Sequence, residues 1–433
     1  MGAKRDDVER RTQIHRVGYV LLWLSIAFAI SRASIFYRMT GERRTDLNLY
    51  RGYAQKILEG EIPYKDFFPE YPPLALQFLT LPTIVDPSLK WYFGLYRAVC
   101  CLVDCAMWVA LVRAYKDGRV RGHQPLLYIL GTTALGALIY DRLDIALGAV
   151  LLFAALSLMD CERTRFHLAV GVGIALKLIP VIFVPAALAF EARKNDRFPF
   201  RALLLLMFPT AASFGVLAVL GGYRFDKLFG YHIERDIEIE STLASIEMVL
   251  MDFGLEGAVT RGFGSHNLNT PVDQILARGA TALLGLVILG TALFAARRNP
   301  NTNMLAILFA AILAWSLLLS KVLSPQYFLF LLPVLVVIPE CQSKLGASAT
   351  WLLVAMICGL TGVIYPGRFD ALTKLEPNAE LILLIRNEYL AALALSLLYR
   401  AWVSHDDDGG GSETTSCTTA EANDASSPLT TKT

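Results

Sequence analysis

Residues Val17–Ile35 read VGYVLLWLSIAFAISRASI, and this stretch decides the class of fold. As a helix it is long enough to cross a hydrocarbon core of about 30 Å. Arg10, Arg11 and Arg16 precede it, and no small-residue cleavage site follows a short apolar core. The stretch therefore predicts a signal anchor rather than a removed signal peptide, with the N-terminus in the cytoplasm.

The composition extends this reading to the whole chain of 433 residues. Hydrophobic residues make up 55% and charged residues only 18%, and the mean hydropathy is +0.47. Soluble chains carry about 25% charged residues. A soluble enzyme, a disordered chain and a nucleic-acid-binding protein are therefore excluded, and the sequence predicts an all-α polytopic membrane protein.

Apolar runs and the basic loops between them predict about ten transmembrane helices with both termini in the cytoplasm. The predicted spans are Val17–Ile35, Trp91–Val112, Leu126–Tyr140, Ile145–Met159, Ala202–Leu220, Arg278–Ala296, Met304–Leu319, Pro325–Pro339, Ala347–Tyr365 and Ala379–Trp402.

Two further apolar runs do not fit a simple crossing. Pro72–Val85 is too short and is interpreted as a partial or re-entrant helix. Phe166–Phe190 carries Lys177 and Pro180 at its middle, which favours two half-helices forming a hairpin. Broken backbone at membrane depth is tolerated only where it faces protein or a cavity.

These assignments divide the chain into three parts. Residues 1–16 form a cytoplasmic tail, and 17–402 form the transmembrane domain with external segments 36–71 and 221–277. Residues 403–433 are rich in Ser, Thr, Gly and Asp, so we expect a disordered cytoplasmic tail.

The first external segment interleaves acids with aromatic residues. Thr45–Leu76 reads TDLNLYRGYAQKILEGEIPYKDFFPEYPPLAL. Sugars pack their C–H faces on aromatic rings and bond acids through their hydroxyls, so the pattern suits a sugar site. The alternative is a solvated amphipathic loop with an interfacial aromatic belt. The candidate residues here are Asp46, Tyr50, Tyr64, Asp66, Glu70 and Tyr71.

Three cations lie within or at the ends of apolar runs, namely Arg142, Lys177 and Lys321. An ionisable group at such depth costs several kcal/mol and indicates a functional site. Clustered cations facing an external acidic segment would hold the phosphate of a lipid. The alternative is snorkelling to the interface, which is easy for Arg142 and hard for Lys177. For Lys177, a structural ion pair with an acidic side chain such as Asp144 or Glu240 also stays open.

The second external segment contains YHIERDIEIES, residues Tyr231–Ser241, with His232, Arg235 and Glu240 as candidates. Its alternative is an ordinary solvated interfacial helix. RGFGSHNLN (Arg261–Asn269) is interpreted as a loop. The sequence contains no Walker motif, GxGxxG or HExxH, so no nucleotide or metal site is predicted.

Several motifs in order resemble the membrane glycosyltransferases of the GT-C superfamily, and most closely glycosyltransferase family 87, the polyprenol-phosphate-mannose-dependent mannosyltransferases. The motifs are Asp46–Tyr50, Ala54–Tyr64, Tyr71–Ala75, R-x-D at Arg142–Asp144, A-L-K-x-x-P at Ala175–Pro180, Y-H-x-x-R at Tyr231–Arg235 and S-P-Q-Y at Ser324–Tyr327. The resemblance covers about residues 17–402. The sequence departs from the acidic pair of many superfamily members, because Leu47 and Asn48 follow Asp46, which weakens any metal-bridging role.

The resemblance implies transfer of a hexose, by default mannose, from a polyprenyl-phosphate-sugar donor to a hydroxyl of a cell-envelope glycolipid or glycan, with inversion. Arabinose and glucose stay open. Asp46 would be the base, and Lys177, Arg142, Arg235 and Lys321 would bind the donor phosphate. Tyr50, Tyr64, Asp66, Glu70, Tyr71, His232 and Glu240 would bind acceptor or sugar. No cofactor or metal is expected, and the partners are membrane lipids, donor and acceptor. The expected location is the plasma (inner) membrane, with the site on the external side.

Two other classes of protein remain open at this point. A lipid-linked sugar flippase or transporter would show paired broken helices and polar groups in both leaflets. A scaffold protein of envelope assembly would leave Lys177 unexplained. The concentration of polar residues in two external segments favours the enzyme.

Overall fold

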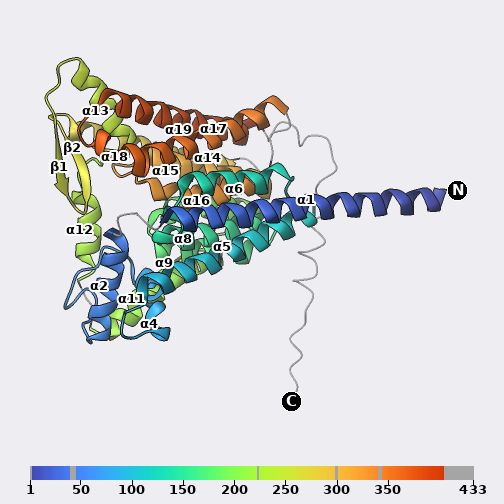
Figure 1. Cartoon of the computed structure of the whole chain (residues 1–433), viewed down its shortest axis with the longest axis horizontal. Coiled ribbons are helices and arrows are strands. Elements are labelled where there is room, and N and C mark those ends of the chain that lie inside the picture. Colours follow the sequence, from blue (N-terminus) through green and yellow to red (C-terminus); the bar gives the residue numbers. More distant parts are fainter. Residues whose placement is uncertain (1, 40–44, 222–223, 298–300, 340–343, 404–433) are drawn as a thin grey trace.

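The computed structural model describes residues 2–39, 45–221, 224–297, 301–339 and 344–403. These residues are almost entirely helical (Figure 1). The elements are α1 (Gly2–Arg38), α2 (Thr45–Leu58), α3 (Pro73–Thr80), α4 (Pro82–Val85), α5 (Tyr92–Lys116), α6 (His123–Leu135), α7 (Leu138–Asp141), α8 (Asp144–Met159), α9 (Arg163–Leu176), η2 (Ile179–Phe183), α10 (Val184–Asn195), α11 (Phe200–Val219), α12 (Asp226–Glu234), α13 (Thr242–Asp252), β1 (Ala258–Gly262), β2 (Ser265–Asn269), α14 (Asp273–Arg297), α15 (Thr302–Leu318), η3 (Pro325–Tyr327), α16 (Phe328–Val337), α17 (Lys344–Gly362), η4 (Val363–Arg368), α18 (Phe369–Leu372) and α19 (Pro377–Val403).

Six segments in the described part of the chain are helical, long and apolar enough to cross a membrane. They are Val17–Arg38, Tyr92–Lys116, Phe200–Val219, Asp273–Arg297, Ser348–Leu372 and Pro377–Val403. The predicted class of multi-pass membrane protein is confirmed, but the number ten is not established. The remaining predicted spans correspond to shorter helices, such as the 16 residues of α8, which extend only about 24 Å.

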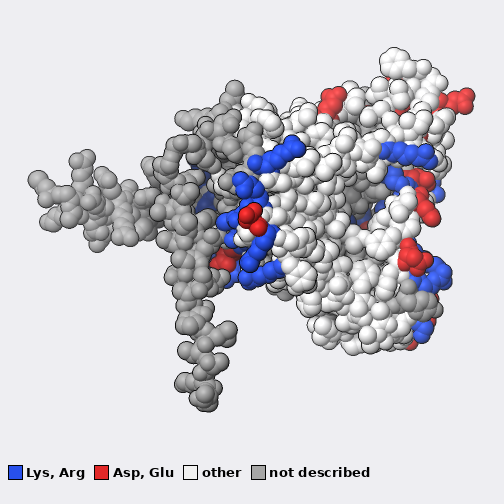
Figure 2. Space-filling view, turned by 180° about the vertical axis from the view of Figure 1, so that it is seen from behind, with Lys and Arg blue, Asp and Glu red and all other residues white. Residues whose placement is uncertain are grey.

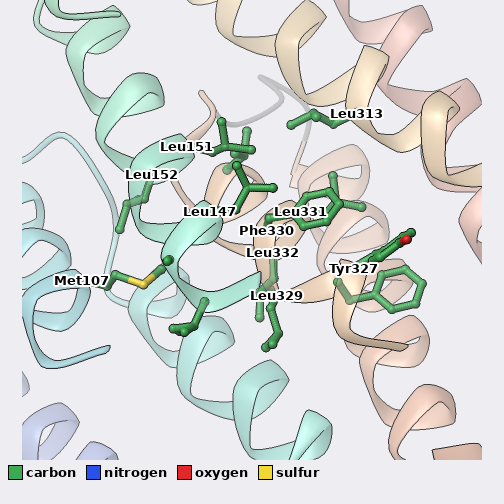
Figure 3. Packing of buried hydrophobic residues seen from close by; sticks show 14 of the residues in the cluster. Met107, Leu147, Leu151, Leu152, Leu313, Tyr327, Leu329, Phe330, Leu331 and Leu332 are labelled. Atoms are coloured by element: carbon green, nitrogen blue, oxygen red, sulfur yellow. The ribbon is translucent and has the colours of Figure 1, made fainter. Parts of the chain in front are cut away.

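Three short apolar helices, α8, α15 and α16, are almost wholly buried and form the centre of the bundle, and longer helices surround them. Every residue of α16 is buried, whereas only 17% of the apolar window of α14 is buried. Figure 3 shows leucines of α8, among them Leu147 and Leu151, beside Phe330 and Leu331 of α16. A helix that is apolar all round must be covered by other helices or by lipid. The inner helices are covered by protein, and we infer that lipid covers the outer ones.

The polar elements gather at one end of the molecule, which we call the site end. There α2, α12, α13, α18 and the two strands lie together, far from the projecting start of α1 (Figure 1). On the face that Figure 2 shows, most charged side chains lie towards the two ends, and the broad band between them carries little charge. The basic loops that the sequence assigns to the cytoplasm are at the end opposite the site end.

The segment after Lys177 doubles back as predicted. Helix α9 ends at Leu176, Lys177 is extended with φ −155° and ψ 122°, and η2 and α10 follow. Arg163 Nη1 at the start of α9 lies 2.8 Å from Glu191 Oε2 near the end of α10. The chain therefore returns to the end from which it came. The short run Pro72–Val85 is likewise broken, into α3 and α4.

The prediction of a loop at Arg261–Asn269 is wrong, because this stretch belongs to an antiparallel hairpin. Gly262 pairs with Ser265, so Phe263 and Gly264 form a two-residue turn, both with positive φ (52° and 73°). Positive φ at both turn positions matches the twist of paired strands. The extended residues 237–239 join this hairpin, since Ile239 N donates to His266 O at 3.0 Å.

Both terminal assignments stay predictions. Residues 2–16 belong to helix α1, which begins at Gly2, and a helical segment is compatible with a cytoplasmic tail. The predicted disordered tail lies outside the described residues from position 404 onward.

Candidate functional site

The proposed base lies at the start of α2. Asp46 occupies the first turn of this helix, where the helix dipole stabilises a carboxylate. Its carboxylate forms an ion pair with Arg142, from the bend between α7 and α8. The Asp46 side chain is 28% exposed and that of Arg142 is 12% exposed. The structure therefore brings two predicted site residues together and leaves the carboxylate accessible.

A second ion pair lies two residues further along the same bend. Lys177 Nζ donates to Asp144 Oδ1 at 2.5 Å, and these side chains are 16% and 4% exposed. The ammonium also lies 4.1 Å from the ring centroid of Tyr327, a cation–π contact. A carboxylate thus compensates the charge of Lys177 in the ligand-free chain, so the phosphate-binding role of Lys177 stays a prediction.

Arg235 has hydrogen-bonding capacity that the structure leaves unused. It follows α12, and its Nη2 donates to Ser265 Oγ at 3.3 Å, while its Nε is buried without a partner. No ion pair among the residues that the structure describes includes Arg235. A guanidinium with spare donors suits a phosphate, which accepts two parallel hydrogen bonds.

His232 lies one turn before Arg235 on α12. Loss of solvent, followed by the positive charges of Arg235 and Lys177, lowers the pKa of His232 to about 4. The ring remains exposed to solvent. At neutral pH the imidazole is uncharged and can bind a hydroxyl as donor or acceptor.

The ammonium of Lys321 binds backbone carbonyls at the end of α12. Its Nζ donates to Ile233 O at 2.7 Å and to Arg235 O at 2.6 Å. A cation at the C-terminal end of a helix satisfies the last carbonyls and interacts favourably with the dipole. Lys321 thereby fixes the backbone that carries Arg235, and direct phosphate contact by Lys321 stays a prediction.

The aromatic and acidic residues of the first segment divide into two groups. In the first group, the Tyr231 hydroxyl donates to Glu70 Oε2 at 2.5 Å, and the hydroxyls of Tyr50 and Tyr71 lie 3.4 Å apart. Burial, and then the nearby charges of Asp144 and Glu70 among others, raise the pKa of Tyr50. Tyr50 therefore lies near Asp144, and the ring centroid of Tyr231 lies 5.7 Å from Arg235 Cζ.

The second group consists of Asp66 and Tyr64. Asp66 is exposed, and its carboxylate accepts from the backbone N–H of Ile62 at 2.8 Å, which stabilises a turn. Tyr64 is buried, donates to the carbonyl of Tyr71 and packs its ring against Phe225. Both side chains already have structural partners. Neither has a hydrogen bond, among the described residues, to Asp46, Arg142, Asp144 or Lys177.

Two buried carboxyls lie on the extended segment after Arg235. Glu238 accepts from Ser324 Oγ at 2.8 and 2.9 Å. Burial, reinforced by the neighbouring charge of Glu238, raises the pKa of Glu240 to about 8, although Arg386 and Arg142 oppose the rise. Arg386 donates to the carbonyl of Glu240. A protonated Glu240 could donate a hydrogen bond to a sugar hydroxyl.

Sequence reasoning singled out Asp144 only as a possible structural partner of Lys177, and it missed other polar residues of this region, namely Arg97, Asp141, Glu238, Ser324, Tyr327 and Arg386. A signal existed for some of them. Ser324 and Tyr327 are parts of a quoted motif, and Arg386 is a cation within a predicted span, which is itself a functional indicator. Groups of three or more metal-ligating side chains do not occur in the described ranges.

The comparison with protein families decides the class. A model described as glycosyltransferase family 87 matches residues 68–325. This chain belongs to glycosyltransferase family 87. The matched residues contain Arg142, Lys177, Arg235 and Lys321, whereas Asp46 precedes them. The predictions of a multi-pass helical membrane architecture and of a glycosyltransferase are thereby confirmed for this family 87 protein.

The chain is also similar to a solved structure. The crystal structure of ArnT from Cupriavidus metallidurans bound to undecaprenyl phosphate is similar to this family 87 chain at 12% sequence identity, with a TM-score of 0.45. The similarity covers 88% of this chain and 77% of ArnT. No curated protein sequence matches this chain.

Proposed function

We propose that this family 87 protein transfers a hexose, specifically mannose, from a polyprenyl phosphate to a hydroxyl of a cell-envelope glycolipid or glycan, with inversion. The observation that carries the proposal is the pair of ion pairs on one bend. Arg142 pairs with Asp46, and Asp144 pairs with Lys177. The proposed base and two cations therefore meet at residues 142–144 of the bend. Family membership supports the class of reaction.

Asp46 acts as the base in the proposed step. Its carboxylate takes the proton of the acceptor hydroxyl while the new bond forms between the acceptor oxygen and the anomeric carbon. The bond from that carbon to the phosphate oxygen breaks, and the electron pair leaves with the phosphate. Aspartate is a weak base, because its reference pKa is about 3.9. It nevertheless suffices here, because it accepts the proton late, when the sugar is oxocarbenium-like.

The cations serve the leaving group. Polyprenyl phosphate departs with an added negative charge, and positioned cations in a water-poor site stabilise such charge strongly. Arg235 has donors to spare, while Arg142 and Lys177 would exchange a carboxylate for the phosphate. Glu70, Tyr71, His232 and Glu240 would bind sugar or acceptor hydroxyls.

The proposed location is the plasma (inner) membrane, with the site on the external side. The positive-inside rule supports this orientation, because the basic loops lie at the end opposite the site end. No cofactor is proposed. A flippase, which would show polar groups in both leaflets, is the second class of protein to be tested.

The test uses purified protein with polyprenyl phosphates that carry mannose, glucose or arabinose, together with an extract of envelope glycolipids. We expect release of polyprenyl phosphate from the mannosyl donor and label in the acceptor fraction. The same protein in sealed vesicles distinguishes the classes. Movement of intact donor across the vesicle, without release of polyprenyl phosphate from any donor, would contradict the transferase and favour the flippase.

A further inference from the structure

The bend Tyr140–Asp144 is held by side chains from several elements. Arg142 and Asp144 form the two ion pairs described above, and the Tyr140 hydroxyl donates to Asp104 Oδ2 of α5 at 2.8 Å. Leu143 is buried. The remaining residue, Asp141, has no part in the proposed chemistry, and its partner is therefore informative.

Asp141 is bound by Arg97, in the second turn of α5. Arg97 Nε lies 2.7 Å from Asp141 Oδ1 and Nη2 lies 3.0 Å from Oδ2, a bidentate arrangement. The two side chains are only 15% and 13% exposed. Bidentate guanidinium–carboxylate pairs fix orientation as well as distance. This pair therefore sets the direction of the backbone immediately before Arg142.

The hydrogen bonds of α7 itself are too few to fix this orientation. Helix α7 has only four residues, Leu138–Asp141, and no side chain caps its start. Such a short helix is not stable by itself. Arg142 then leaves the helix in an extended conformation, with φ −126° and ψ 144°. The orientation of Arg142 consequently depends on contacts made by its neighbours.

We propose that Arg97 is a positioning residue, which acts through Asp141 to aim Arg142 at Asp46 and Asp144 at Lys177. The proposal gives Arg97 no contact with substrate. The consequence for turnover rests on the proposed function, while the effect on the bend does not. A displacement of about 1 Å in a catalytic group can cost about 10²-fold in rate.

The first variant must avoid leaving a buried charge alone, because an unpaired buried charge destabilises by about 3–5 kcal/mol. The double substitution Arg97→Gln/Asp141→Asn removes both charges together. Its matched control is Arg119→Gln/Asp160→Asn, which removes another Arg–Asp pair, one that lies at the end opposite the site end with its nitrogen 2.8 Å from the carboxylate. Arg97→Lys keeps the charge but loses the bidentate geometry.

Amide hydrogen exchange tests the bend without any assumption about activity. We expect exchange of the amides of Leu138–Asp141 to rise in Arg97→Gln/Asp141→Asn and to stay at the wild-type rate in the control. An unchanged rate in both variants would overturn the proposal.

Kinetics test whether Arg97 acts through Arg142. We expect kcat to fall about 10- to 100-fold in the neutral pair variant and less in Arg97→Lys, with the acceptor KM unchanged. Adding Arg97→Gln/Asp141→Asn to Arg142→Gln should cause no further loss, because groups that act as one unit are not additive. Fully additive losses would overturn the positioning role. A wild-type protein without transfer activity would contradict the proposed function instead, and exchange alone would then decide whether Arg97 holds the bend.

Discussion

The ion pair between Lys177 and Asp144 bears on whether Lys177 is structural or binds the donor phosphate. The ammonium is paired at 2.5 Å with a carboxylate that is only 4% exposed. Lys177→Met leaves that carboxylate unpaired, so we expect stability to fall by about 3 kcal/mol, the low end for breaking a buried pair. Adding Asp144→Asn should restore most of the melting temperature. The measurement is thermal unfolding in detergent.

The opposite result is equally informative for the same residue. If Lys177→Met alone melts at the wild-type temperature, the pair with Asp144 is not structural. The binding of polyprenyl phosphate by the double variant then separates the roles. A loss of about 2–5 kcal/mol in that binding is expected where a desolvated charge contacts the phosphate.

Buried carboxyls make stability depend on pH. The pKa values of Glu240 and Glu247 are both raised to about 8, chiefly by burial. Between pH 5 and 8 the unfolded chain has lost these protons while the folded chain retains them, so stability falls as pH rises through this window. Glu240→Gln and Glu247→Gln should each flatten the dependence of melting temperature on pH. Parallel curves for wild type and both variants would contradict these shifts.

Close approach between helices is the property to test at the scale of elements. A Cβ at Gly171 of α9 would lie 2.5 Å from Leu205 O and 2.8 Å from Leu206 O of α11. Backbone cannot move aside cheaply, and small residues permit such contacts in membranes. Gly171→Ala should lower the melting temperature by several degrees. Gly290→Ala on α14, where a Cβ meets nothing within 4 Å, is the control. Equal effects of the two substitutions would contradict the packing of α9 on α11.

The elements differ in how well the sequence predicts them, for physical reasons. The hairpin around Lys177 and Pro180 was predictable because a cation and a proline at membrane depth both oppose an unbroken span. The strands β1 and β2 were not. Their pairing depends on a turn in which Phe263, a residue disfavoured at positive φ, adopts 52°, and on the neighbouring segment 237–239.

Partnerships between side chains were the least predictable part of the site. The sequence indicated Asp46, Arg142 and Lys177 individually, from position and depth. It gave no means of pairing Arg142 with Asp46 or Lys321 with the carbonyls of α12, because those contacts join segments far apart in the chain. Pairing is a property of the folded bundle, and Arg97 escaped notice for the same reason.

Orientation in the membrane is the property of the whole molecule that remains to be tested. In the proposed orientation, α13 lies outside the cell, and the loop between α10 and α11 lies in the cytoplasm. Single cysteines at Phe253, which is 85% exposed, and at Arg197 suit an impermeant label in a background without the native cysteines. We expect labelling of Phe253→Cys in intact cells and of Arg197→Cys only after permeabilisation. The reverse pattern would place the site in the cytoplasm.

The turnover of Asp46→Asn tests the central claim most directly. Asparagine keeps the shape of the side chain but cannot accept the proton of the acceptor hydroxyl. With saturating mannosyl polyprenyl phosphate, we predict a loss of at least about 10²-fold in turnover, while the protein folds and binds polyprenyl phosphate like wild type. Near-normal transfer by Asp46→Asn would contradict the account and direct attention to Glu70.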